Sequence, residues 1–203
     1  MPTEITPLNA PLGACVRGTR LKGNINPNDF QTIQQALLDH HLLLFPDQDI
    51  TEAEQVGFSG LFGELEIHPF GQNLEDHPEV LVIHHDVNAK YGNNNWHSDV
   101  TWRQKPSLGS ILRGKIIPDV GGDTLFADMY AAYDYLSDGV KEQIDDAVAE
   151  HDFLLPFGGG MSEEKRAAML EKYPPAQHPV VRTHPETGQR GLYVKGRFTT
   201  KVH

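Results

Sequence analysis

The sequence predicts an α+β, mainly β fold, namely an antiparallel jelly roll decorated with helices. Short apolar or β-branched runs, each long enough for one strand, are separated by turn residues. Helical segments with their own capping residues interrupt these runs. The chain has 203 residues, 38% of them hydrophobic and 22% charged, which suffices for one domain with a sizeable core. We therefore expect a single domain spanning residues 1–203.

The first third of the chain predicts two helices and one strand. Asn28 or Asp29 is a suitable cap for a helix that runs to about residue 40, with apolar residues at helical spacing. Residues 42–45 form a short apolar run that Pro46 ends, as in a buried strand. The residues 51–54, Thr-Glu-Ala-Glu, make a capping box, which starts a second helix up to about residue 63.

Three further strands are expected in the middle of the chain. Residues 80–83 are continuous and β-branched, which is typical of a strand buried on both sides. Residues 108–112 and 124–126 are also predicted strands, separated by a turn at residues 118–122.

The last third predicts three helices and a hairpin. Asp128 caps a helix to about residue 136, Ser137 opens another to about residue 150, and Ser162 starts a charged helix to about residue 172. Residues 180–183 and 191–194 flank a Pro-Glu-Thr-Gly turn, which indicates a hairpin.

Composition excludes several classes of partner and location. The formal net charge is −11, so the basic surface that nucleic acid requires is missing. The single cysteine, Cys15, cannot form an internal disulfide, which is typical of a reducing cytosol. The amino terminus has no basic or apolar signal-peptide region, and no apolar run reaches the length of a membrane span. We expect a cytoplasmic protein with no nucleic acid or membrane partner; homo-oligomer formation stays open.

Two His-x-Asp pairs are candidates for a metal site. Side chains two residues apart on a strand point to the same face, so such a pair can offer one nitrogen and one carboxylate to one metal ion. Chance gives about one pair in a chain of this composition, so the pattern alone is weak. His84/Asp86 closes an apolar run and enters a polar loop, whereas His97/Asp99 lies between Trp96 and the apolar residues that follow it. The second context favours a walled pocket, and we take His97 and Asp99 as the candidate ligands.

The surrounding sequence resembles the taurine/2-oxoglutarate-dependent dioxygenase family. Four stretches carry the resemblance, in the family's order and with similar spacing, and together they cover nearly the whole chain: Phe-Gly-Glu-Leu-Glu-Ile-His-Pro (62–69), Asn-Trp-His-Ser-Asp-Val-Thr (95–101), Gly-Gly-Asp-Thr-Leu-Phe (121–126) and His-Pro-Val-Val-Arg-Thr-His-Pro (178–185). Any one of them would be weak evidence, but four in order are specific.

The resemblance implies a fold, a reaction and a set of cofactors. The fold is the double-stranded β-helix, or jelly roll. The reaction consumes 2-oxoglutarate and O₂ at Fe(II), releases succinate and CO₂, and hydroxylates a substrate C–H group. Iron is held by two histidines and one carboxylate, which leave three adjacent positions open. His97 and Asp99 match the first histidine and the carboxylate, and Thr124 matches the threonine that binds the distal carboxylate of 2-oxoglutarate.

The same resemblance assigns residues to the pocket of the primary substrate. His68 matches the histidine that meets the anionic head group of sulfonates, and Asn93, Val100, Phe157 and Phe198 match other pocket positions. Read without the resemblance, His68 is a turn residue before a proline, and the two phenylalanines are core aromatics. Where taurine users place a tyrosine three residues after the histidine, this chain has glycine. The substrate class is therefore a small anion, such as a sulfonate, an alkyl sulfate or an aryloxyalkanoate, with taurine itself less favoured.

The family's second iron histidine and its arginines fall after residue 203. His203 does not match the distal histidine, so we expect the 203 residues to be the amino-terminal portion of the catalytic domain, inactive by themselves. Two alternatives stay open. One is a non-catalytic jelly-roll fragment or binding module. The other is a zinc hydrolase using His97, Asp99 and a further histidine, which the absence of a third ligand at recognisable spacing disfavours.

Overall fold

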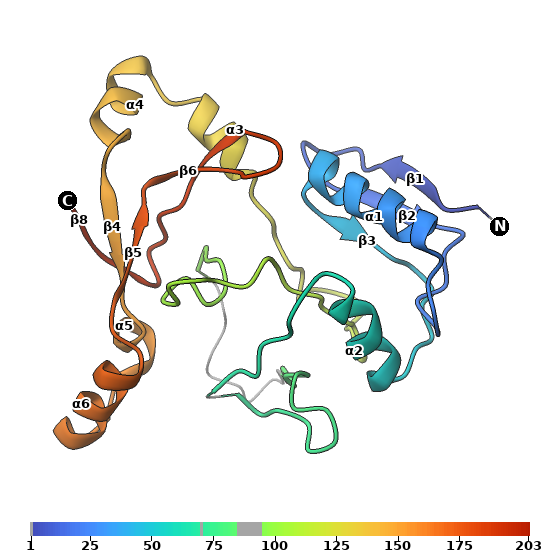
Figure 1. Ribbon diagram of the computed structural model, residues 1–203, viewed down its shortest axis with the longest axis horizontal. Helices are drawn as coiled ribbons and strands as arrows, with labels where there is room; N and C mark the ends of the chain where they lie inside the picture. Colours follow the sequence, from blue (N-terminus) through green and yellow to red (C-terminus); the bar gives the residue numbers. More distant parts are fainter. Residues whose placement is uncertain (1, 70, 85–94) are drawn as a thin grey trace. The chain divides into compact units, whose positions relative to one another are not determined.

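The computed structural model describes residues 2–69, 71–84 and 95–203. The chain divides into two compact units, Met1–Tyr91 and Gly92–His203. Each unit combines helices with small sheets (Figure 1). Helices and strands are therefore mixed, as expected. The jelly roll itself and the single domain stay predictions.

The first unit is built around a three-stranded sheet and one long helix. β1 (Glu4–Pro7) pairs antiparallel with β2 (Ala14–Arg17), and β2 pairs parallel with β3 (Leu43–Leu44). The helix α1 (Pro27–His40) makes the crossover between β2 and β3 and lies over the sheet (Figure 1). A parallel pair needs such a crossover because a tight turn cannot reverse the chain twice.

The apolar stripe of α1 closes the core of this unit. Ile33 is fully buried against Val16 of β2 and against Phe58 of α2 (Glu52–Gly60). Phe58 meets the rings of Phe45 and Phe62 edge-on, with centroids 5.6 and 5.4 Å away. The predicted capping box at Thr51 is confirmed, because Thr51 and Glu54 exchange both hydrogen bonds. The cap of α1 is Asn26 rather than Asn28 or Asp29, since Pro27 occupies the first helical position.

The second unit contains a three-stranded antiparallel sheet and a hairpin. The sheet has the order β5-β4-β8; its strands are β4 (Val148–His151), β5 (Ala176–Pro179) and β8 (Thr199–Val202). The hairpin pairs β6 (Val181–Thr183) with β7 (Arg190–Leu192). The predicted hairpin is thus confirmed with slightly shorter strands.

Four helices accompany these strands, and they are α3 (Met129–Asp134), α4 (Asp138–Ile144), α5 (Leu154–Phe157) and α6 (Glu163–Lys172). The capping residues Asp128 and Ser162 are confirmed by their side-chain hydrogen bonds to the first turns of α3 and α6. The helix expected to run to residue 150 is wrong in its second half, because residues 148–151 pair with two strands as β4. Tertiary pairing overrides helix propensity there.

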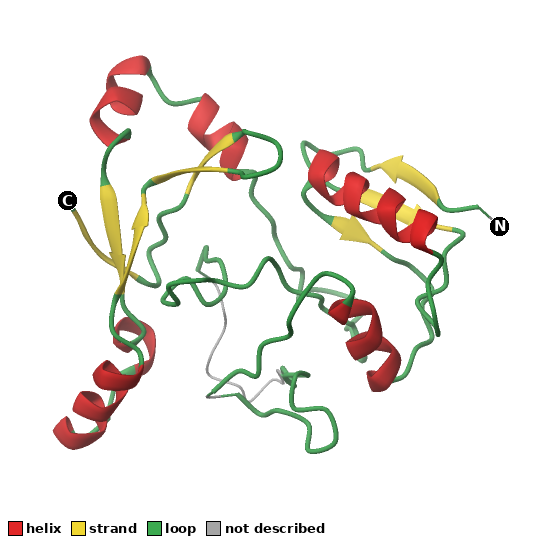
Figure 2. Ribbon diagram, viewed as in Figure 1, coloured by secondary structure: helices red, strands yellow, loops and turns green. Residues whose placement is uncertain are grey.

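The described residues between α2 and α3 contain neither helix nor strand (Figure 2). The strands expected at residues 80–83, 108–112 and 124–126 are therefore wrong; only an isolated bridge joins Asn73 to Leu81. Two backbone hydrogen bonds flank this bridge, from Leu74 N–H to the Val80 carbonyl and from Val82 N–H to the Gln72 carbonyl, but the pairing is too short to make a strand. Apolar side chains of this stretch stay exposed, among them Ile116 at 89% and Val120 at 91%.

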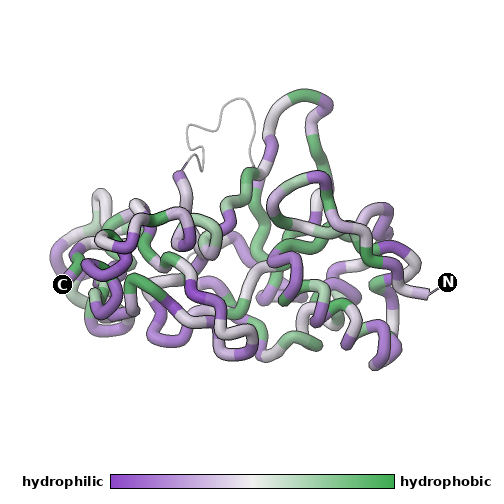
Figure 3. The backbone as a smooth tube through the Cα atoms, turned by 90° about the horizontal axis from the view of Figure 1, so that it is seen from above, coloured by the Kyte–Doolittle hydropathy of each residue, from purple (hydrophilic) through white to green (hydrophobic). Residues whose placement is uncertain are grey.

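Hydrophobic and hydrophilic segments are interspersed along the described part of the backbone (Figure 3). Among the residues that the structure describes, no helix is long and apolar enough to cross a membrane.

Candidate metal centre

The side chains of His97 and Asp99 converge. Nε2 of His97 lies 3.6 Å from Oδ1 of Asp99, with the two side chains 27% and 60% exposed. Nδ1 of His97 donates to the carbonyl oxygen of Asn95 at 2.8 Å, since a carbonyl only accepts. This assignment places the hydrogen on Nδ1 and leaves Nε2 with a lone pair that can bind a metal ion.

The second carboxylate oxygen of Asp99 is also held. The hydroxyl of Ser110 donates to Oδ2 at 2.8 Å. Oδ1 therefore faces His97 while Oδ2 is occupied by a neutral donor, an arrangement that orients the carboxylate without adding a competing charge.

A turn, and not a strand, brings the pair together. Residues 99–102 form a turn in which the backbone N–H of Arg103 donates to the carbonyl of Val100 at 2.9 Å. Val100 has a φ of +47°. A β-branched residue rarely adopts this left-handed conformation, which costs about 1–3 kcal/mol and persists only where the surroundings impose it. The expected strand geometry is thus wrong, although the side chains converge as predicted.

Two donor atoms at this separation suit one metal ion. Bonds of ~2.0–2.2 Å that meet at angles between 90° and 120° place their donors roughly 2.8–3.8 Å apart, and the observed 3.6 Å falls toward the wide end of that range. Within residues 2–69, 71–84 and 95–203, no group of three or more His, Cys, Asp or Glu side chains has the geometry of a metal site. The residues present therefore fit two of the three ligands of a facial triad.

One residue of the competing His-x-Asp pair and one predicted pocket residue lie outside the described residues. Asp86 lies outside the described residues, so the His84/Asp86 pair has no geometry to set against His97/Asp99. Asn93, predicted to line the substrate pocket, lies outside them as well.

Three predicted pocket residues gather in one apolar cluster of the second unit. Val100 and Phe198 are buried, and Phe157 packs against the same cluster at the end of α5. The rings of Phe157 and Phe198 have centroids 6.2 Å apart. Because Val100 directly follows Asp99, this cluster begins one residue from the candidate metal ligand.

Thr124 and His68 lie in irregular segments. Thr124 is exposed in the stretch without helix or strand, so the expected strand position is wrong. His68 belongs to the first unit and is partly buried, with its carbonyl accepting from Nδ2 of Asn73 at 2.8 Å. A Cβ atom at Gly71 would meet Cδ1 of Leu81 at 1.9 Å. The side chain of Leu81 thus fills the space that a side chain at position 71 would need.

Sequence reasoning missed a buried polar cluster behind the turn. His151 of β4 is fully buried, and its Nδ1 lies 3.0 Å from the hydroxyl of Thr101. His178 of β5 is also buried, and its Nε2 lies 2.9 Å from the carbonyl oxygens of both Thr101 and Arg103. The only signal in the sequence was that His178 opens one of the four family-like stretches.

Burial sets the protonation state of this cluster. Burial, with nearby His178 and Lys195, lowers the pKa of His151 to about 4, so the ring is neutral near pH 7; a backbone group of Tyr193 acts weakly in the opposite direction. Burial, followed by the charge of Arg182, lowers the pKa of Lys195 to about 8. Arg182 and Lys195 both contact the ring of Tyr193, at 4.5 and 4.8 Å from its centroid.

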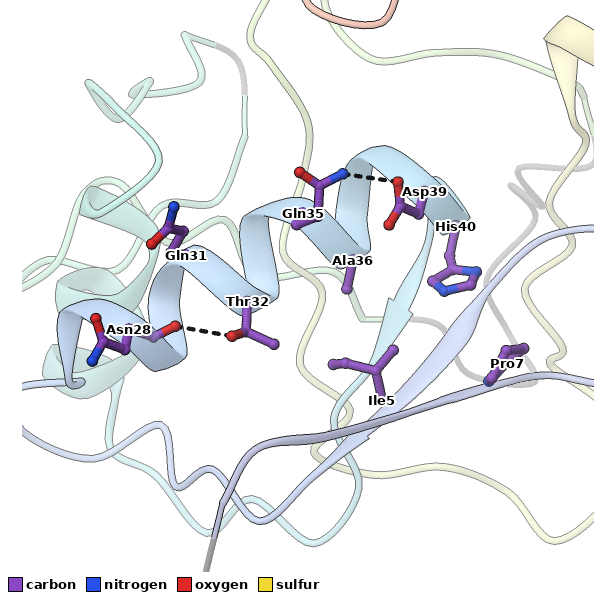
Figure 4. A pocket seen from close by; sticks show the side chains of 9 residues that line it. All are labelled: Ile5, Pro7, Asn28, Gln31, Thr32, Gln35, Ala36, Asp39 and His40. Atoms are coloured by element: carbon purple, nitrogen blue, oxygen red, sulfur yellow. Dashed lines mark hydrogen bonds between the residues drawn. The ribbon is translucent and has the colours of Figure 1, made fainter.

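A separate open groove in the first unit runs along α1 beside β1 (Figure 4). It is lined by Ile5, Pro7, Asn28, Gln31, Thr32, Gln35, Ala36, Asp39 and His40. None of the predicted site residues lines it.

Comparison with known proteins finds relatives that are named as dioxygenases. The chain is 32% identical to the (S)-phenoxypropionate/alpha-ketoglutarate-dioxygenase of Sphingobium herbicidovorans over 94% of its own length and 70% of that protein. The crystal structure of a taurine dioxygenase from Burkholderia xenovorans matches with a TM-score of 0.81 and 33% identity, over all of this chain and 66% of that one. The structure of AAD-2 in complex with Mn(II) and N-oxalylglycine matches with a TM-score of 0.74 and 29% identity, over 97% of this chain and 70% of that one.

The chain therefore spans about two thirds of the length of these relatives. The family model described as "Taurine catabolism dioxygenase TauD, TfdA family" matches residues 4–203. A match over nearly every residue, together with the four motifs in order, leads to one conclusion: the chain belongs to the TauD/TfdA family of dioxygenases.

Proposed function

We propose that the protein containing this chain is an Fe(II)- and 2-oxoglutarate-dependent dioxygenase that hydroxylates a small anionic substrate and releases succinate and CO₂. The convergence of His97 Nε2 and Asp99 Oδ1 at 3.6 Å carries the proposal. The relatives support it, because one is named for alpha-ketoglutarate and another holds Mn(II) with N-oxalylglycine, a close mimic of 2-oxoglutarate in shape.

In this proposal His97 and Asp99 hold the iron, each oriented by a neighbour. The Asn95 carbonyl fixes the tautomer of His97, and the Ser110 hydroxyl fixes the carboxylate of Asp99. When bound, the metal supplies the oxidative decarboxylation of 2-oxoglutarate and the transfer of one oxygen atom from O₂ to the substrate. The protein contributes binding, orientation and exclusion of water.

In this proposal the hydroxyl of Thr124 binds the distal carboxylate of 2-oxoglutarate. A threonine hydroxyl donates one hydrogen bond to such a carboxylate, and an arginine would add a charge-assisted pair. Thr124 is accessible in the stretch between α2 and α3, as a ligand-binding side chain must be.

The proposal assigns separate residues to the apolar part and to the anionic group of the substrate. Val100, Phe157 and Phe198 share one cluster that suits the carbon skeleton of a substrate. His68 and Asn93 are assigned the polar end. Sulfonates, alkyl sulfates and aryloxyalkanoates all combine an apolar part with an anionic group, and Gly71 in place of tyrosine disfavours taurine among them.

In this proposal the third metal ligand and the arginines lie in sequence that follows residue 203 in the whole protein. The relatives are about half as long again as the matched region, which leaves room for those residues and for the strands that complete a jelly roll. The 203 residues are then the amino-terminal portion of one catalytic domain.

The test measures iron-dependent succinate formation by the complete protein, by its His97→Ala and Asp99→Ala variants, and by residues 1–203 alone. Loss of turnover in both variants and in the short chain, with full turnover in a His184→Ala control, supports the proposal. His184 suits this control because it lies in the turn of the β6–β7 hairpin, where its Nδ1 accepts from Glu186 and Thr187.

Two results argue for other functions. Turnover in His97→Ala and Asp99→Ala would remove these residues from the metal centre. Absence of any 2-oxoglutarate consumption by the complete protein would favour a binding module, and zinc-dependent ester or amide hydrolysis would favour a hydrolase.

A further inference from the structure

The turn that follows Asp99 is held in a conformation its own sequence disfavours. Val100 adopts a φ of +47°, which a β-branched side chain resists. Something outside the turn must therefore impose this conformation. Asp99 itself contributes little, because its side chain is 60% exposed and the hydroxyl of Ser110 is a single neutral contact.

Two histidines on neighbouring strands form hydrogen bonds with Thr101 and Arg103, at the end of this turn. The Nε2–H of His178 donates to the carbonyls of Thr101 and Arg103, both at 2.9 Å, since both partners only accept. Nδ1 of His151 meets the hydroxyl of Thr101 at 3.0 Å. These contacts join Thr101 and Arg103 to two histidines that lie 50 to 77 positions further along the chain.

The sheet fixes the two histidines rigidly. His151 pairs with Ala176, and His178 pairs with Ala149, so the two rings lie diagonally across β4 and β5 on one face. Their centroids are 5.2 Å apart, with the planes nearly perpendicular. Tyr193 stacks on His151 and meets His178 edge-on, with centroids 5.7 and 5.3 Å away. Neither imidazole can turn without breaking ring contacts.

We propose that His151 and His178 are positioning residues that hold the turn at residues 99–102 so that Asp99 points at His97, and that they thereby set the affinity of the metal centre. This inference rests on the proposed role of His97 and Asp99 as ligands. Neither histidine touches the metal; both act through Thr101 and the backbone of the turn. The low pKa of His151 is consistent with this role, because a neutral ring can be buried behind the turn without a counter-charge.

Mn(II) affinity of the complete protein, measured by the loss of the free Mn(II) EPR signal, tests the inference without turnover. His178→Leu should weaken binding by about 10–100-fold, as is usual when an outer partner of a metal ligand is lost. His178→Gln should stay within about threefold of the original protein, because a Gln amide can donate from the position of Nε2. Thr101→Val, which replaces the hydroxyl with a methyl group of similar size, should weaken binding by about threefold or more.

Repeating the His178→Leu measurement in a protein that also carries Val100→Gly separates positioning from general destabilisation. Glycine adopts positive φ without strain, so a turn with Val100→Gly no longer needs the histidines to impose its conformation. In that background the effect of His178→Leu on Mn(II) affinity should shrink to about threefold or less. A general loss of stability would weaken binding equally in both backgrounds and would overturn the inference, as would unchanged affinity in His178→Leu.

The His97→Ala and Asp99→Ala variants separate a failure of the ligand assignment from a failure of the positioning role. If they lose Mn(II) binding while His178→Leu and Thr101→Val bind like the original protein, the positioning role is wrong and the ligand assignment stands. If His97→Ala and Asp99→Ala bind Mn(II) normally, the ligand assignment is wrong, and the positioning role fails with it.

Discussion

Nδ1 of His151 lies 3.0 Å from the hydroxyl of Thr101, although 50 residues separate the two in the sequence. This contact ties the central strand of the β5-β4-β8 sheet to the turn that presents Asp99. It also makes the stability of the second unit sensitive to the protonation of one ring.

Acidification should destabilise the protein through His151. Its folded-state pKa of about 4 lies below the ordinary value of 6.5, so the unfolded chain binds the proton more readily between these values. The free energy of unfolding therefore falls as the pH is lowered from about 7 to about 4, by up to about 3 kcal/mol from this residue. Denaturant titrations at pH 7 and pH 5 measure the change. His151→Gln should show a smaller loss over the same interval; an identical loss would mean that His151 is not the responsible group.

Thr124→Val should weaken 2-oxoglutarate binding in the complete protein. The change keeps the shape of the side chain and removes the donor, which leaves the ligand carboxylate short of one partner at a cost of about 1–3 kcal/mol. The apparent affinity for 2-oxoglutarate measures this effect, and Mn(II) affinity should stay unchanged. Unaltered 2-oxoglutarate affinity would remove Thr124 from the site.

His68→Ala should reduce the turnover of anionic substrates without reducing the decarboxylation of 2-oxoglutarate alone. The KM for the anion rises because its charged group loses a partner, while substrate-independent decarboxylation of 2-oxoglutarate persists. The panel should contain taurine, longer sulfonates, alkyl sulfates and aryloxyalkanoates. Equal activity of the variant and the original protein on every anion would show that His68 is only a turn residue before Pro69.

Residues 1–203, prepared alone, should self-associate. The stretch between α2 and α3 exposes large apolar side chains, including Leu108, Ile116 and Val120 at 71%, 89% and 91%. Exposed apolar surface of this kind associates in water. Sedimentation velocity should show oligomers that shrink toward the monomer when Ile116→Lys and Val120→Glu are combined. A monomer at high concentration without these changes would contradict the prediction.

Features set by neighbouring residues were predictable from the sequence. The capping box at Thr51 and Glu54, the caps Asp128 and Ser162, and the β6–β7 hairpin all depend on interactions within a few positions. The proximity of His97 and Asp99 was predictable for the same reason, because one residue separates them. Family membership followed from the order of four short motifs, which need no knowledge of the fold.

Other features depended on partners that a single segment does not reveal. Residues 148–151 have a helical pattern, yet they become β4 because β5 and β8 lie on either side. Residues 80–83 have a strand pattern, yet their pairing with residues 72–74 stays limited to one isolated bridge and two flanking hydrogen bonds. Strand formation requires hydrogen bonds between distant segments, whereas caps and turns are completed locally.

The sequence by itself therefore determined the family and the helix caps at Thr51, Asp128 and Ser162, and it predicted His97 and Asp99 as metal ligands. The tertiary structure alone decided that the His97/Asp99 pair sits at a turn with a strained Val100, and that His151 and His178 hold this turn from behind. The physical reason is that backbone strain is stable only where long-range contacts impose it, and such contacts exist only once β4 and β5 have paired.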